Sequence, residues 1–234
     1  MNDFLFCFYQ LKHRDMMSYS FLLFPKFKEQ ISKDSIIQAL DLIVDIIAYT
    51  KGNRISIDEI NRFQEKFSSR MVESRLYPGG SNILFGLGVD IESNGPVIFK
   101  PYYNRHLAQL IIHYFTVTEC TLYDKRFSHD NSDYVIKVPD VIGLAKIDSS
   151  SRSFPILLTR EVIGKSLQHQ PLLIRKISDL SRHLALQGFI CDPYGSNWKI
   201  IVTNNPKIIY YLDLLSSNSL KNVKERIAAL IELL

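Results

Sequence analysis

The chain has 234 residues, of which 46% are hydrophobic and 22% charged, and its formal net charge is +4. This composition is typical of a soluble globular protein of one large or two small domains, and it excludes a disordered chain. The basic residues are spread thinly along the sequence, so we expect no nucleic-acid partner. The three cysteines are too far apart for a disulfide framework or a CxxC metal site, which favours a reducing cytoplasm.

An N-terminal helical extension is predicted over residues 1–72. Apolar residues of "SIIQALDLIVDIIAY" recur at helical spacing, and "SIDE" at 56–59 is a capping box that opens a second helix. The first 24 residues contain apolar patches such as "FLFCFY", but charged residues interrupt them before any run reaches the length of a membrane-spanning helix. We therefore expect no membrane span, and the order of charge and apolar residues does not suit a signal peptide.

A small β-rich lobe is predicted over residues 73–163. The segment 75–103 reads as strand, glycine-rich loop, strand, tight reversal and strand, because apolar runs alternate there with "PGGSN" and "ESNG". Helical spacing returns from residue 104 to about 119, and two further strands follow at 141–147 and 154–163. We expect a five-stranded antiparallel sheet with one helix.

The remaining residues, 164–234, predict a shortened helical lobe. A helix at 171–188 ends at Gly188 as a C-terminal cap, and the loop "DPYGSN" follows at 192–197. The stretch "WKIIVTNNPKIIYYLD" then reads as a hairpin over 198–213, and the last 16 residues, "SLKNVKERIAALIELL", have the spacing of an amphipathic helix.

This succession of elements resembles the protein-kinase-like fold, a two-lobed α+β architecture. Lys100 in "VIFKPY" stands where that family has its third-strand lysine, which contacts the phosphates of ATP, and Glu119 falls where the family has the glutamate that pairs with it. The resemblance implies that the backbone from Glu161 to Ile163 meets the adenine. It also implies that the glycine-rich segment cradles phosphates through Gly79, Gly80 and Ser81.

The loop and hairpin carry the rest of the resemblance. "DPYGSN" gives Asp192 and Asn197 the D-x-x-x-x-N spacing of the family's catalytic loop, and the hairpin returns to Asp213. The resemblance implies that Asp192 is the catalytic carboxylate facing the acceptor hydroxyl. Asn197 and Asp213 would bind Mg²⁺, and the implied cofactors are ATP and Mg²⁺.

Departures from the family leave three functions open. The glycine-rich segment is not G-x-G-x-x-G, Asp213 is followed by Leu-Leu instead of Phe-Gly, and few residues follow it. The first hypothesis is an atypical phosphotransferase that resembles the aminoglycoside and small-molecule kinases and has an unknown small-molecule or protein acceptor. The second is a pseudokinase-like module that binds a partner. The third is an unrelated α+β structural protein. Taken singly, "DPYGSN" also has the composition of an ordinary turn.

Overall fold

The computed structural model forms two compact units. The first combines residues 1–107, 141–161 and 231–234, and the second combines residues 108–140 and 162–230. The residues that the structure describes are 7–12, 18–27, 29–71, 74–80, 82–91, 95–119, 125–129, 131–149, 151–167, 172–173, 175, 178, 189–190, 197–202, 206–213 and 216–217.

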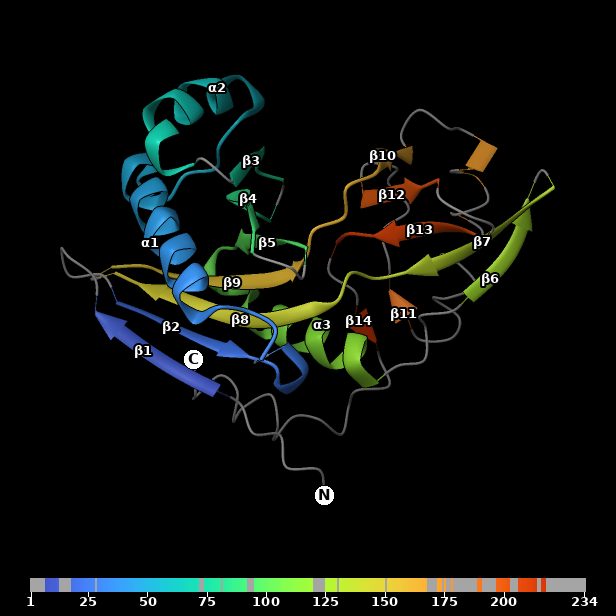
Figure 1. Ribbon diagram of the computed structural model, residues 1–234, viewed down its shortest axis with the longest axis horizontal. Coiled ribbons are helices and arrows are strands. Elements are labelled where there is room, and N and C mark those ends of the chain that lie inside the picture. The colour runs from blue at the N-terminus through green and yellow to red at the C-terminus, as the bar shows by residue number, and fades with distance from the viewer. Residues whose placement is uncertain are drawn as a thin grey trace. The chain divides into compact units, whose positions relative to one another are not determined.

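The first unit contains a seven-stranded antiparallel sheet in the order β1-β2-β8-β9-β5-β4-β3 (Figure 1). All five predicted strands are present in it, but the prediction of five strands is wrong because two further strands extend the sheet beyond β8. Pairing with β2 satisfies backbone groups of β8 that an edge strand would leave without partners. The seven strands are β1 (Cys7–Lys12), β2 (Ser18–Leu23), β3 (Ser74–Pro78), β4 (Phe85–Asp90), β5 (Pro96–Pro101), β8 (Val141–Asp148) and β9 (Ser153–Arg160).

The two helices predicted in the N-terminal segment are present, and they belong to the same unit as the sheet. Helix α1 (Lys33–Thr50) is capped at its start by Ser32, whose side chain accepts a hydrogen bond from the Ser35 N–H. It is followed by Lys51 and Gly52, which have left-handed φ values of 52° and 72°. Helix α2 (Ile57–Lys66) begins with the predicted capping box between Ser56 and Glu59. Hydrogen bonds from Ser56 lower the pKa of the Glu59 carboxyl. Short 3₁₀ turns lie at η1 (Pro25–Phe27) and η2 (Ser68–Arg70).

Helix α1 covers one face of the sheet. The register of the strands shows which side chains lie on that face and which lie on the opposite face. Tyr19 of β2 donates a hydrogen bond to Asp41 of α1, 3.0 Å between oxygens. The register places Tyr19 opposite Ile147 of β8, and Ile147 opposite Phe154 of β9, so these side chains share the α1 face. The residues of β9 and β5 that alternate with this set, among them Lys100 opposite Leu157, lie on the opposite face.

The second unit is built around a five-stranded mixed sheet in the order β10-β12-β13-β7-β6. The predicted hairpin is confirmed as β12 (Trp198–Ile201) and β13 (Lys207–Tyr211), and β13 pairs in parallel with β7 (Ser132–Lys137). The other strands are β6 (Lys125–His129) and β10 (Lys165–Ser166), and a separate pair joins β11 (Phe189–Ile190) to β14 (Ser216–Ser217). The sequence did not predict this sheet beyond the hairpin.

The remaining helical predictions have different outcomes. The helix predicted from residue 104 is confirmed as the turn η4 (Asn104–His106) followed by α3 (Leu107–Glu119). In the helix predicted at 171–188, the backbone is helical at the four described residues 172, 173, 175 and 178. The C-terminal helix predicted at 219–234 lies outside the described residues. Within the described part of the chain, no helix has the length and apolar character needed to cross a membrane.

Candidate functional site

The two residues predicted to bind a metal lie beside each other at the open end of the β12–β13 hairpin. Asn197 directly precedes β12, and Asp213 follows β13 after one residue. The Leu212 N–H donates to the Asn197 carbonyl at 2.8 Å, which extends the hairpin pairing by one step. The Asn197 side-chain nitrogen then lies 3.4 Å from Asp213 Oδ2, a long hydrogen bond between half-buried groups.

The packing of the hairpin fixes this pair. Trp198 and Tyr211 are opposite each other in the register, their ring centroids are 4.8 Å apart, and both side chains are buried. The packed rings join the two strands directly after Asn197 and two residues before Asp213. An amide oxygen and a carboxylate oxygen are hard ligands of the kind that Mg²⁺ prefers.

The other predicted nucleotide-binding residues are distributed over both units. Lys100 lies in β5 of the first unit and is 8% exposed, whereas Asn197 and Asp213 belong to the second unit. Glu119 is the last residue of α3, and its side chain is outside the described set. Asp192, the predicted catalytic carboxylate, and Ser81 also lie outside the described residues, so their roles stay predictions.

The glycine-rich loop follows β3 and is packed most tightly at Gly79. Its N–H donates to the Ile55 carbonyl at 2.8 Å, so this group is already used within the protein. A Cβ atom at Gly79 would lie 2.2 Å from Arg54 Cγ and 2.3 Å from the Leu84 carbonyl oxygen, and therefore only glycine fits there. At Gly80, by contrast, a Cβ atom would meet nothing within 4 Å.

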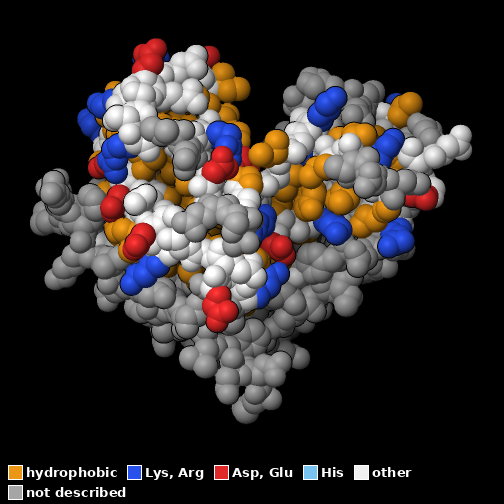
Figure 2. Space-filling view, in the orientation of Figure 1, with side chains coloured by type: hydrophobic (Ala, Val, Ile, Leu, Met, Phe, Trp, Pro, Cys, Tyr) orange, Lys and Arg blue, Asp and Glu red, His pale blue; other side chains and the backbone are white. Residues whose placement is uncertain are grey.

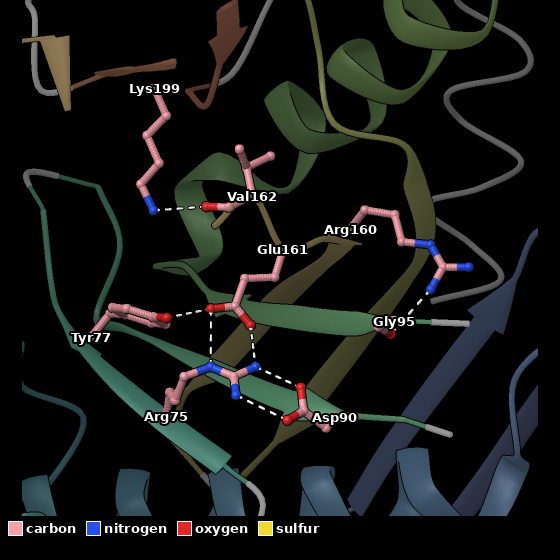
Figure 3. Close-up of polar contacts among 8 residues, drawn as sticks. All are labelled: Arg75, Tyr77, Asp90, Gly95, Arg160, Glu161, Val162 and Lys199. Atoms are coloured by element: carbon pink, nitrogen blue, oxygen red, sulfur yellow. Dashed lines mark hydrogen bonds and ion pairs between the residues drawn. The ribbon is translucent and has the colours of Figure 1, made fainter. Parts of the chain in front are cut away.

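Glu161, predicted to contribute only its backbone, has a buried side chain at the centre of a polar network in the first unit (Figure 3). The carboxylate is 3% exposed, and Arg75 Nη2 of β3 lies 2.8 Å from its Oε2. Tyr77 of the same strand donates a short hydrogen bond to Oε1. Gly88 of β4 makes room for the carboxylate, since a Cβ atom at Gly88 would lie 2.5 Å from Oε2.

Asp90 at the end of β4 is the second carboxylate on Arg75. Arg75 Nη2 and Nη1 lie 2.7 and 3.0 Å from its two oxygens, but the Asp90 side chain is 54% exposed. The hydrogen bonds that Arg75 donates to Asp90 and Glu161 raise the pKa of Arg75, and they lower the pKa of Asp90. Burial, with the hydrogen bond to Glu161, raises the pKa of Tyr77 to about 12. At neutral pH, Arg75 and Asp90 are therefore charged and Tyr77 is neutral.

Within each unit, a hydrogen bond holds part of the segment predicted to meet the adenine. The Glu161 N–H donates to the Pro96 carbonyl at 2.9 Å, which continues the pairing of β9 with β5. In the second unit, Lys199 Nζ of β12 donates to the Val162 carbonyl at 2.9 Å (Figure 3). Ile163 follows with 66% of its side chain exposed. The backbone on both sides of the Glu161–Val162 bond is thus fixed.

The sequence contains a pattern that is compatible with the Glu161 network, but this pattern does not identify Glu161 by itself. Arg75 and Tyr77 alternate in "SRLYP", and the register sets them opposite Gly88 and Gly86 of β4. Polar side chains facing glycines on a neighbouring strand indicate that another side chain fills the space, but only the fold shows that it is Glu161.

Comparisons with known proteins add no assignment. No family model matches the chain, and no curated protein matches it. Among the described residues, no three His, Cys, Asp or Glu side chains are grouped in a way that could hold a metal ion. On the face shown in Figure 2, the described Lys and Arg side chains are interspersed with Asp and Glu.

Proposed function

We propose that the chain is an atypical phosphotransferase of the protein-kinase-like type, which binds ATP with Mg²⁺ and acts on a small-molecule or protein acceptor. The observation that carries this proposal is the contact between Asn197, the last residue of the "DPYGSN" loop, and Asp213 at the open end of the hairpin. An ordinary turn needs an Asp or Asn for its own backbone, but it does not need a carboxylate held beside the amide 16 residues later.

The donor set of this pair suits the proposed metal. Mg²⁺ keeps several water ligands and is usually bound through one or two carboxylates together with substrate phosphates. Asp213 and Asn197 would supply two oxygen ligands, and the Asn197 nitrogen already faces Asp213, which leaves the amide oxygen for a cation. ATP, when bound, supplies the phosphoryl group that is transferred.

The other roles follow from the same proposal. Lys100 would offset phosphate charge with Glu119 as its partner, and Asp192 would accept the proton of the acceptor hydroxyl. Gly80 and Ser81 would lie next to the phosphates, and the backbone from Glu161 to Ile163 would meet the adenine.

A two-lobed architecture and a cytoplasmic location belong to the proposal as well. The five predicted strands are adjacent in the order β3-β4-β5-β9-β8, and this contiguous set supports the proposed small lobe. Lys100 lies in β5, the third of these strands along the chain. The division into two compact units supports the existence of a second lobe. The three widely separated cysteines favour the cytoplasm.

The alternative is a pseudokinase-like module that binds a partner. One observation favours it: the Gly79 N–H, which a phosphate-binding loop would direct at its ligand, is donated to Ile55 instead. The Leu-Leu pair that follows Asp213 points in the same direction.

Thermal unfolding with nucleotide separates these two functions. A ligand that binds only the native state stabilises it by RT ln(1 + [L]/Kd), about 2.7 kcal/mol at 100 times the Kd. ATP with Mg²⁺ should therefore raise the melting temperature of the wild type, and Asp213→Asn should remove the Mg²⁺-dependent part of the shift. Asp140→Asn, at an exposed position of the same unit, is the matched control and should behave as wild type. No shift at millimolar ATP and Mg²⁺ refutes the phosphotransferase function.

A further inference from the structure

The connection between α1 and α2 is joined to both ends of the glycine-rich loop. Ile55 of this connection is fully buried, and its carbonyl accepts a hydrogen bond from the Gly79 N–H at 2.8 Å. Its own N–H donates to the Leu84 carbonyl at 2.9 Å. One residue of the N-terminal segment thus fixes the loop where it leaves β3 and where it returns to β4.

Arg54, the residue before Ile55, contacts the same loop through its side chain. Its aliphatic stem occupies the space beside Gly79, where a Cβ atom would lie 2.2 Å from Arg54 Cγ. Its Nη1 donates to the Gly80 carbonyl at 3.2 Å. The loop is therefore closed by Arg54 on the Gly79 side, whereas the position of a Gly80 Cβ atom is open.

The direction of the Gly80 carbonyl matters for an anion. A carbonyl oxygen carries partial negative charge, so it repels a phosphate that it faces and must be turned away if the loop is to accept one. A hydrogen bond from a guanidinium group holds the carbonyl in one direction and adds a positive charge beside the turn. Because Arg54 lies on the protein surface, it makes this contact without a large desolvation cost.

We propose that Arg54 is a positioning residue for the phosphates of the bound nucleotide, acting by orienting the Gly79–Gly80 turn. This inference rests on the proposed function, because it assigns a role at the same nucleotide site. It makes the connection between α1 and α2 part of that site. The position of the loop then depends on the N-terminal helices, although these precede every residue that resembles the kinase-like family.

The test compares nucleotide with nucleoside binding by calorimetry. Arg54→Ala should weaken the binding of ATP with Mg²⁺ about tenfold, the usual effect of losing a hydrogen bond from a charged group, and should leave adenosine affinity unchanged. Arg54→Lys keeps the charge and the stem and should recover most of the ATP affinity. Arg62→Ala, at an exposed position of α2, is the matched control and should bind both ligands as wild type does.

The outcomes separate this inference from the proposed function. Unchanged ATP affinity in Arg54→Ala, or equal losses for ATP and adenosine, overturns the role of Arg54 while nucleotide binding by the wild type stands. If the wild type binds neither ATP nor adenosine, the proposed function fails and this inference fails with it. Should Arg54→Ala not fold, Arg54→Gln, which keeps the stem beside Gly79, replaces it with the same expectation for both ligands.

Discussion

Two carboxylates bind the same arginine, and they should differ sharply in what they contribute to stability. Glu161 and Asp90 both pair with Arg75, at 2.8 and 2.7 Å, but their side chains are 3% and 54% exposed. Replacing each acid with its amide changes one functional group and keeps the shape. Glu161→Gln should therefore destabilise the first unit much more than Asp90→Asn does.

The magnitude follows from burial. Breaking a fully buried ion pair costs about 3–5 kcal/mol, because a charge is left without compensation. Arg75 is 37% exposed and keeps Asp90 after the change, so we expect about 2–3 kcal/mol for Glu161→Gln. The glutamine also turns an amide N–H₂ toward the donors of Arg75 or Tyr77. The Asp90 pair lies in solvent, where such pairs contribute below about 1 kcal/mol, and Asp90→Asn should cost about 0.5 kcal/mol.

The assay is urea unfolding of both variants followed by far-ultraviolet circular dichroism. The single tryptophan, Trp198, belongs to the second unit, so its fluorescence serves only as a check that the loss is confined to the first. In 1 M salt, where the Debye length is about 3 Å, the Asp90→Asn effect should vanish and the Glu161→Gln effect should persist. Equal losses for the two variants, or a larger one for Asp90→Asn, would refute the argument from burial.

Two further predictions concern the same network. Because the pKa of Tyr77 is raised to about 12, its contribution to stability is fully present below pH 10, the unfolded-state value, and is lost as the pH rises toward 12. Tyr77→Phe should therefore flatten the fall in urea midpoint between pH 10 and 12, and an unchanged slope contradicts this prediction. Gly88→Ala places a Cβ atom 2.5 Å from the Glu161 carboxylate and should lower the free energy of unfolding in urea by about 2 kcal/mol. Gly80→Ala, whose Cβ atom meets nothing within 4 Å, is the control and should leave the free energy of unfolding nearly unchanged. Similar effects of the two substitutions would show that the carboxylate moves freely.

Sequence separation explains which parts of the site could be predicted. Asn197 and Asp213 are 16 residues apart and are joined by a hairpin, so strand alternation alone brings them together. Arg75 and Glu161 are separated by 86 residues, and their contact depends on the order β9-β5-β4-β3, which no local pattern contains. The Arg54 contact with Gly80, across 26 residues, similarly requires knowing where the connection after α1 runs.

The same reasoning applies to the fold. Strands β3, β4, β5, β8 and β9 alternate with turn residues and were predicted, as was the capping box of α2. Strand β2 was missed because "SYSFLL" is a short run with five buried residues in succession, a pattern that does not distinguish strand from helix. Its partner β8 begins at Val141, more than a hundred residues further along the chain. In the second unit, the parallel pairing of β7 with β13 is likewise non-local.

The N-terminal segment is therefore a structural part of the first unit. Strand β2 pairs with β8, α1 contributes eight buried side chains, and Ile55 forms hydrogen bonds with both ends of the glycine-rich loop. A chain without residues 1–72 would expose the β8 edge and the apolar face beneath α1 together, and both changes promote aggregation. Any phosphotransferase or partner-binding activity of the unit consequently depends on residues outside the segment that resembles the kinase-like family. Binding measurements are informative only on the full chain, with single substitutions such as Arg54→Ala in place of truncations.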